Sequence, residues 1–160
     1  MPQTSTASSA VKSKAQSPDA LALLKADHEL VQDLFEKFEK ASTDKQKDTL
    51  AEQICTELSI HAQIEEEIFY PAVREAIEDE DLMDEAEVEH EGAKDLIAEI
   101  EASQAGEDKF DAKVTVLGEY VKHHVNEEQS EMFPKVRKAD LDLKEIGAAM
   151  AARKAELQSA

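Results

Sequence analysis

The sequence has few of the residues on which several protein classes depend. Its 160 residues include one cysteine, no tryptophan, four glycines, four prolines and 4% aromatic residues. The single cysteine, Cys55, excludes an internal disulfide framework and a cysteine-rich zinc site. The scarcity of glycine, proline and aromatic residues disfavours a β-sandwich or barrel. It favours helices in one domain with a core of its own.

Positive charge is also scarce. Lysine and arginine total 18 against 37 acidic residues, which gives a net charge of −19 at pH 7. Such a surface repels phosphate backbones and anionic lipids, so we expect no nucleic-acid partner and no membrane partner. No apolar run approaches the roughly 18–20 residues that a transmembrane helix needs.

The first residues carry no secretory signal. Residues 1–17 contain Lys12 and Lys14, no acidic residue and no continuous apolar segment. We therefore expect residues 1–18 to form a flexible tail, and we expect the protein to be cytoplasmic.

The most informative feature of the sequence is one stretch that occurs twice. The first copy is HAQIEEEIFYP over residues 61–71, and the second is HVNEEQSEMFP over residues 124–134. In each copy a glutamate follows the histidine by four residues and a proline follows it by ten. Residues i and i+4 lie on one face of a helix, roughly 6 Å apart along its axis. Each copy therefore directs an imidazole and a carboxylate toward one point: His61 with Glu65, and His124 with Glu128.

A further histidine precedes each copy at nearly the same distance. His28 lies 33 residues before His61, and His90 lies 34 residues before His124. The surrounding sequences match as well, DHELVQDL from residue 27 and EHEGAKDL from residue 89. The pattern indicates an internal repeat of a helix pair.

Apolar residues at spacings of three, four and seven predict four long helices and a shorter one. The prolines of the repeat, Pro71 and Pro134, fall within the second and fourth helices and are expected to kink them. The expected ranges are residues 19–40, 44–77, 82–104, 109–138 and 142–157.

Short loops between these helices make them antiparallel neighbours. The sequence therefore predicts an all-α fold, an antiparallel up-down-up-down four-helix bundle over residues 19–138. Residues 139–160 are expected to form a short C-terminal fifth helix that docks on this bundle.

Four histidines and two glutamates occupy inward positions where core residues are expected. No lysine or arginine on the inward stripes neutralises the glutamates, and an unpaired buried carboxylate costs several kcal/mol. One or two cations would remove this cost. Nitrogen and oxygen ligands without thiolate suit iron, manganese or zinc. Six ligands leave two octahedral ions unsaturated, which favours a redox-active di-iron centre.

These motifs resemble the hemerythrin family, specifically the bacterial hemerythrin-like HHE cation-binding domain, over about residues 21–138. The resemblance implies a four-helix bundle that holds two iron ions with an oxo or hydroxo bridge. The ligands that it implies are His28 and His61 for one iron, His90 and His124 for the other, and Glu65 and Glu128 bridging both.

The sequence departs from the oxygen carriers of that family in its third helix. Those proteins have another ligating histidine one turn after the first, where this chain has Ala93 and Lys94. The departure favours oxygen or peroxide chemistry, nitric oxide binding or sensing over oxygen carriage. Glu57 and Tyr120, each one turn before a ligand histidine, are possible additional ligands.

Other residues near the motifs receive no ligand role. At 100° per residue, Tyr70 is rotated about 140° from Glu65, so we do not expect it to be a ligand. His123 with Glu127 is a competing register of the second copy. That register breaks the match to Pro134, so His124 with Glu128 is favoured.

The leading functional hypothesis is a non-haem di-iron protein that binds oxygen, peroxide or nitric oxide for sensing, storage or detoxification. The alternative is a di-iron oxidoreductase with peroxidase-like, catalase-like or oxygen-activating activity. A second alternative is an iron-responsive switch. No catalytic residue is assigned, and the sequence indicates no oligomeric state.

Overall fold

The computed structural model describes residues 18–160, so the expected tail lies, but for residue 18, outside the described residues. The described residues form α-helices and two π-helical segments, η1 and η2, and contain no strand. In chain order the elements are α1 (Ala20–Lys40), α2 (Asp44–Ile64), η1 (Glu65–Phe69), α3 (Tyr70–Ile77), α4 (Glu80–Glu101), α5 (Phe110–Glu127), η2 (Glu128–Met132), α6 (Phe133–Lys138) and α7 (Leu143–Ser159).

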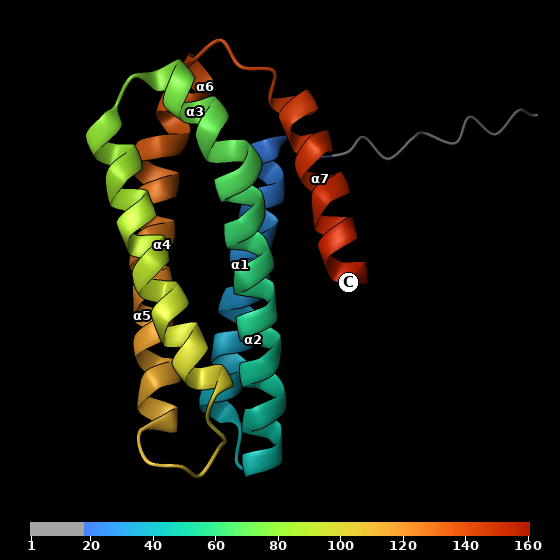
Figure 1. Ribbon diagram of the computed structural model, residues 1–160, viewed down its shortest axis with the longest axis vertical. Coiled ribbons are helices and arrows are strands. Elements are labelled where there is room, and N and C mark those ends of the chain that lie inside the picture. The colour runs from blue at the N-terminus through green and yellow to red at the C-terminus, as the bar shows by residue number, and fades with distance from the viewer. Residues whose placement is uncertain (1–17) are drawn as a thin grey trace, which may run out of the picture.

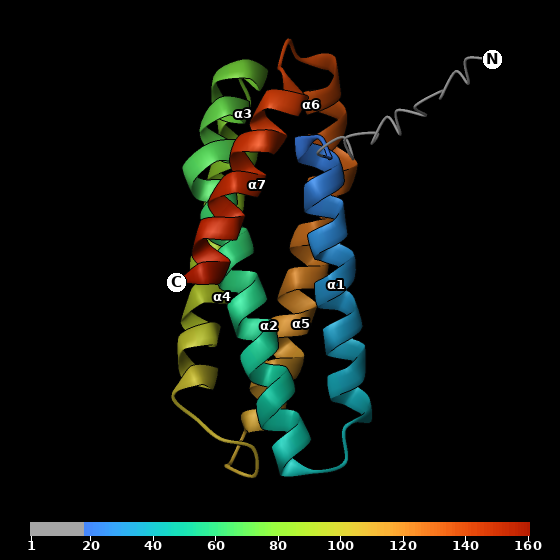
Figure 2. The ribbon, with the colours of Figure 1, turned by 90° about the vertical axis from the view of Figure 1, so that its right-hand side faces the viewer.

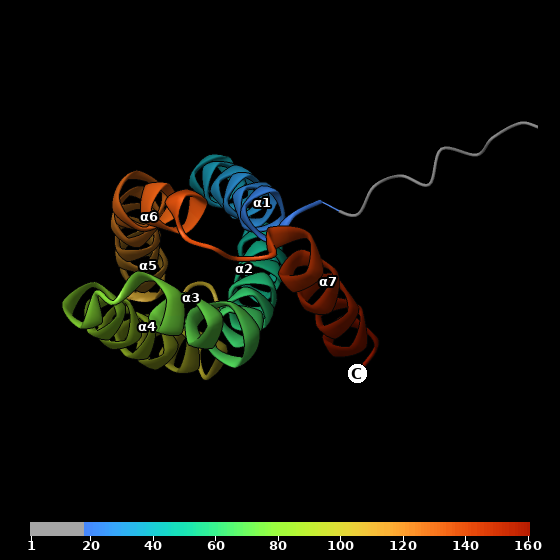
Figure 3. The ribbon, with the colours of Figure 1, turned by 90° about the horizontal axis from the view of Figure 1, so that it is seen from above.

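The predicted four-helix bundle is confirmed. The segments α2, η1 and α3 form one continuous helix, as do α5, η2 and α6, and with α1 and α4 they run up and down the bundle (Figure 1). Seen along the bundle, α1, α2, α4 and α5 surround a common centre (Figure 3). The most extensive packing joins α1 to α2 and α4 to α5, so the bundle consists of two helical hairpins.

Side chains at the helix starts explain where the helices begin. Asp19 accepts the N–H of Ala22 at 2.8 Å, and Thr43 forms a reciprocal capping box with Gln46. At the start of α7, Asp142 accepts the N–H of Glu145. Each such cap stabilises its helix by roughly 1 kcal/mol.

A π-helical turn precedes each proline of the repeat. The N–H of Tyr70 donates to the carbonyl of Glu65, and the N–H of Phe133 donates to the carbonyl of Glu128. These are i to i+5 hydrogen bonds, which fit one extra residue into the turn. The side chain five residues after each glutamate therefore returns to the glutamate's face of the helix.

Two apolar clusters fill the bundle on either side of a polar layer. Along α1, Leu24 belongs to the cluster near α3, α6 and α7, and Val31 belongs to the cluster at the opposite end. His28 lies between them in sequence. Cys55 is buried in the second cluster, and burial raises its pKa to about 12, which suits a small apolar role.

Helix α7 lies obliquely across the outside of the bundle, against α1 and α2 (Figure 2). Its Met150 is fully buried in the first cluster. Gly147 lets α7 approach the start of α1, because a Cβ there would lie 2.6 Å from the carbonyl oxygen of Pro18 and 2.7 Å from the backbone nitrogen of Ala20. None of the helices in residues 18–160 has the length and apolarity to cross a membrane.

This close approach predicts opposite effects for two glycine substitutions. Gly147→Ala should lower the free energy of unfolding by about 1–3 kcal/mol, because backbone atoms cannot move aside as a side chain can. Gly92→Ala is the control, because its Cβ would meet nothing within 4 Å. It should raise stability by about 0.5–1 kcal/mol through helix propensity. Urea denaturation followed by circular dichroism measures both, and equal destabilisation would contradict the prediction.

Candidate metal centre

Each long helix contributes one histidine to the polar layer, and the two π-helical segments each begin with a glutamate. Both carboxylate side chains are 0% exposed. Glu65 is the first residue of η1 and Glu128 is the first residue of η2, so in each repeat the widened π-helical turn lies directly beside the carboxylate. We call the six residues the His4Glu2 centre: His28 on α1, His61 on α2, His90 on α4, His124 on α5, and Glu65 and Glu128 on η1 and η2.

The six side chains divide into two groups of donor atoms, each lying within 4.8 Å of one another. We call them site A (His28, His61 and Glu128) and site B (Glu65, His90 and His124). The carboxylates also join the groups. Glu65 Oε1 lies 2.8 Å from Nε2 of His61 in site A and 3.5 Å from Nε2 of His90 in site B. Both carboxylates are therefore within reach of both sites.

In each of the four histidines Nδ1 is the outer nitrogen, directed away from the other donor atoms, and its partners occupy equivalent positions in the two repeats. Nδ1 of His61 lies 2.9 Å from Asp27, which directly precedes His28. In the second repeat, Nδ1 of His124 lies 3.4 Å from Glu89, which directly precedes His90. A carboxylate on Nδ1 fixes the tautomer and leaves Nε2 free to bind a metal.

The other two outer nitrogens contact the residue that follows each buried glutamate. Nδ1 of His28 lies 2.8 Å from Oε1 of Gln129, and Nδ1 of His90 lies 3.5 Å from Glu66. All four Nε2 atoms therefore face inward. None of these four partners was predicted from the sequence, although the alignment of the two repeats pairs Asp27 with Glu89 and Glu66 with Gln129.

The donor set fits a cation. Among residues 18–160, five buried side-chain atoms lack a hydrogen-bond partner, and all five belong to this centre. Leaving such atoms unpaired costs about 1–3 kcal/mol each. A cation would bind the lone pairs of the four that face inward, whereas the fifth, Nδ1 of His90, faces Glu66. The five atoms are Nε2 of His28, both carboxylate oxygens of Glu65, Nδ1 of His90 and Oε1 of Glu128.

The ionisation of the centre depends on contacts among its own members. Burial lowers the pKa of His61, but the charge of Glu65, the hydrogen bond that His61 donates to Asp27 and the close contact with Glu65 raise it to about 10. Burial raises the pKa of Glu65, yet the charges and close contacts of His61 and His90 hold it well below its usual range. A cation competes with protons for these lone pairs, so binding should release protons.

Tyr70 lies in the centre, contrary to the expectation from the sequence. Its hydroxyl donates to Oε2 of Glu128 at 2.7 Å and lies 3.1 Å and 3.2 Å from Nε2 of His90 and His124. The two Nε2 atoms are 3.3 Å apart. Neighbouring donors on an octahedral cation are about 3 Å apart when each bond is about 2.1 Å. The three atoms are thus spaced as ligands of one ion would be.

The physical reason is the π-helical turn. The rotation of 140° holds for 100° per residue, whereas η1 places Tyr70 five residues after Glu65 on the same face. Burial, followed by the charges of Glu128 and Glu65, raises the pKa of Tyr70 well above its usual range. Phe133 occupies the equivalent position of the other repeat, so only one half of the centre has a phenol. The ring of Phe133 stacks on that of His28, with the ring centroids 6.4 Å apart.

Comparison with known proteins identifies the family of this chain. The family model of the hemerythrin HHE cation-binding domain matches residues 19–136, which contain both copies of the repeat. The chain belongs to the hemerythrin HHE family. A crystal structure of an HHE cation-binding domain-containing protein from Mycobacterium kansasii superposes with a TM-score of 0.76 and 25% identity, covering 89% of this chain and 88% of that one.

One curated relative is longer than this HHE domain. A protein of Nostoc sp. named DNA nickase is 29% identical over 115 residues, which are 72% of this chain and 32% of the relative. The chain therefore spans about a third of the length of that relative.

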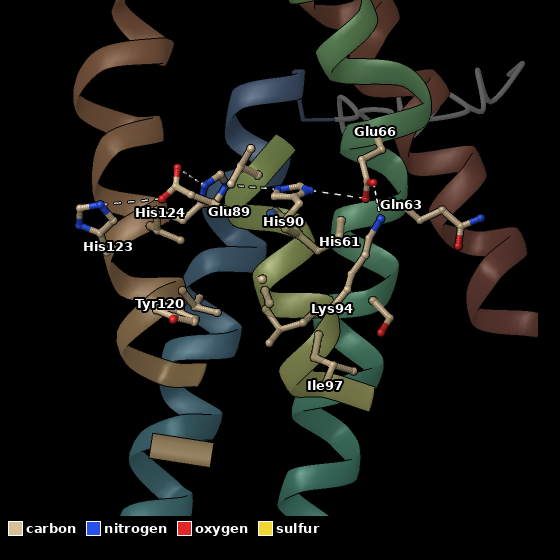
Figure 4. Close-up of a pocket in the computed structure, with 18 of the residues that line it drawn as sticks. His61, Gln63, Glu66, Glu89, His90, Lys94, Ile97, Tyr120, His123 and His124 are labelled. Atoms are coloured by element: carbon tan, nitrogen blue, oxygen red, sulfur yellow. Dashed lines mark hydrogen bonds and ion pairs between the residues drawn. The ribbon is translucent and has the colours of Figure 1, made fainter. Parts of the chain in front are cut away.

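The structure places the two possible additional ligands outside the His4Glu2 centre of this HHE domain. Tyr120 is 53% exposed, and Glu57 is half-buried and belongs to neither site. Tyr120 lines a cavity that leads to the centre, and Glu57 contributes a donor atom to neither group. His123 points away from His90 (Figure 4), with its side chain 66% exposed beside Glu127.

A cavity of about 1310 Å³ leads from the centre toward solvent among α2, α4 and α5 (Figure 4). His61, His90 and His124 form part of its wall. Tyr120 lines it too, farther along α5 from the histidines, and Lys94 lines it with its ammonium beside Glu66 (Figure 4). The remaining wall combines carboxylates, among them Glu66, Glu89 and Glu127, with the apolar side chains of Val31, Leu58, Ala93, Ile97 and Val121. Small molecules can thus reach the histidines along a wall that is partly acidic and partly apolar.

Proposed function

We propose that this HHE domain holds two iron ions, in sites A and B, and binds oxygen, peroxide or nitric oxide there. The observation that carries the proposal is a set of four buried donor atoms that face the centre without a hydrogen-bond partner: Nε2 of His28, both oxygens of Glu65 and Oε1 of Glu128. Bound iron would supply a change of oxidation state and open positions for a small ligand. Four imidazoles and two carboxylates would hold the ions, with Glu65 and Glu128 shared between the sites.

The remaining groups would support this function by orientation and exclusion. Asp27 and Glu89 hold two rings by Nδ1, so that Nε2 faces the ions. We propose Tyr70, in place of Tyr120 and Glu57, as the additional ligand, because its hydroxyl lies among the site B donors. The cavity gives small molecules a path to the centre, and its acidic side chains favour uncharged molecules over anions.

A second candidate function is peroxide-consuming or oxygen-activating catalysis. The phenol of Tyr70 at the centre favours it, because a phenol can supply a proton or an electron beside the ions. The name of the Nostoc relative does not lead us to propose DNA binding here. The net charge of −19 opposes contact with a phosphate backbone.

One loading experiment tests the proposal. Metal-free protein is loaded with ferrous iron under anaerobic conditions, desalted, assayed for bound iron and then exposed to air while its absorbance is recorded. Two ions per chain and a new near-ultraviolet charge-transfer band would support the proposal, and retention of no iron would refute it. Reversal on removing oxygen supports binding, whereas steady turnover of added peroxide supports the oxidoreductase.

A further inference from the structure

Helix α7 reaches the His4Glu2 centre through one lysine. Nζ of Lys154 lies 2.5 Å from Oδ1 of Asp27, and Oδ2 of the same carboxylate lies 2.9 Å from Nδ1 of His61. The side chain of Asp27 is 7% exposed and that of Lys154 is 22% exposed. A chain of polar contacts therefore runs from α7 through a buried carboxylate to a histidine of site A.

The matching contact in site B has a different outer partner. Glu89 faces His124 at the longer distance of 3.4 Å, and its side chain is 25% exposed. Its second oxygen lies 3.8 Å from Nε2 of the exposed His123. Among residues 18–160, no lysine or arginine pairs with Glu89. The repeat thus places a carboxylate on both histidines, but only Asp27 is also paired with a lysine, a contact that we call the clamp.

Site B has a more exposed lysine contact at its other histidine: Lys94 pairs with Glu66, whose second oxygen lies 3.5 Å from Nδ1 of His90. The side chains of Lys94 and Glu66 are 43% and 30% exposed, against 22% and 7% for Lys154 and Asp27.

The contact between Lys154 and Asp27 restricts the orientation of His61. Asp27 is held at both oxygens, so it cannot turn away from His61 without leaving the Lys154 ammonium unpaired in a largely buried place. Glu89 can turn toward solvent at little cost. Partners that orient a ligating histidine typically change metal affinity by about 10–100-fold. Site A should therefore bind its ion more tightly than site B.

We propose that Lys154 is a positioning residue that makes the two metal sites unequal, so that site A retains its ion while site B exchanges it. The inference rests on the proposed two-iron function. It also gives α7, which lies beyond the matched residues 19–136, a role at the metal centre in addition to its packing.

The test is ferrous iron release to an excess of chelator, measured anaerobically on the full chain. The wild type should release two ions in two phases. Lys154→Met should accelerate the slow phase about 10-fold and leave the fast phase unchanged. Lys154→Arg, which keeps a donor and a charge, should restore most of the slow phase.

Arg153 offers a matched control on the adjacent position of α7. It pairs with Glu67 at 2.8 Å and contacts no member of the centre, so Arg153→Met loosens the docking of α7 without touching Asp27. It should lower Tm and leave both phases unchanged. This separates a positioning role from a merely structural one.

Four outcomes would overturn the inference. If the wild type binds two ions but releases them in one phase, the sites are equal. If Lys154→Met leaves both phases unchanged, as Arg153→Met should, or accelerates both equally, the clamp has no selective effect. If Lys154→Arg fails to restore the slow phase, charge and hydrogen bonding at this position are not the cause. Fewer than two ions bound to the wild type would refute the proposed function itself.

Discussion

Glu65→Gln is expected to abolish the stabilisation that iron gives to the wild type. Glu65 is 0% exposed, and both of its oxygens lack a hydrogen-bond partner. The amide keeps the size of the side chain but removes the charge shared by both sites. Losing a shared ligand should cost at least the upper end of the roughly 10–100-fold that removing an outer partner costs, so we expect the affinity to fall by about 100-fold or more. A ligand present at 100 times its Kd stabilises a protein by about 2.7 kcal/mol. For a chain of this size that corresponds to a rise in Tm of roughly 5–10 °C.

The measurement is thermal unfolding of each protein with ferrous iron and with chelator, under anaerobic conditions. The wild type should show the rise in Tm, and Glu65→Gln should show little or none. Glu67→Gln is the control, because that exposed glutamate lies on the same π-helical turn but pairs with Arg153. It should keep the full rise. An undiminished rise in Glu65→Gln would mean that Glu65 does not hold the ions.

The fold could be predicted because its determinants are local. Apolar spacing and capping side chains predicted every helix, with ends that differ from the structure by at most three residues; α4, for instance, runs Glu80–Glu101 rather than over residues 82–104. The six residues of the centre share one pattern of spacing in two repeats. Local geometry joins each glutamate to its histidine, since i and i+4 lie on one face of a helix, and the inward stripes of the four helices bring the pairs together with His28 and His90.

The positions of Tyr70 and Lys154 at the centre depend on geometry that a helical repeat of 100° per residue does not describe. A count of 100° per residue turns Tyr70 away from Glu65, and only the i to i+5 hydrogen bond of η1 returns it. Pro71 was the one local signal, because a residue without an N–H disturbs the turn before it. The contact of Lys154 with Asp27 spans 127 positions and exists only because α7 docks where it does.

Tyr70→Phe is expected to remove a visible charge-transfer band from the iron-loaded, oxidised protein while the two ions remain bound. In the metal-free protein, burial and the charges of Glu128 and Glu65 raise the pKa of Tyr70, so the hydroxyl stays protonated at neutral pH. Two bound cations would outweigh the negative charges of Glu65 and Glu128 and would lower the pKa of a phenol that coordinates them. A coordinated phenolate on ferric iron would absorb visible light, and phenylalanine at this position would make the halves alike, since Phe133 already occupies the equivalent place.

Tyr120→Phe is the matched control, because it removes the other tyrosine hydroxyl of the chain from a side chain that is 53% exposed. The band should persist in Tyr120→Phe and vanish in Tyr70→Phe, with iron content equal in both. If the band were absent from the wild type, Tyr70 would remain a hydrogen-bond donor to Glu128 and not a ligand. If it vanished only in Tyr120→Phe, α5 would have to rotate in the loaded protein to bring that phenol inward. Absorbance and iron quantitation on the three proteins therefore separate a phenolate-ligated centre from one in which histidine and glutamate alone hold the metal.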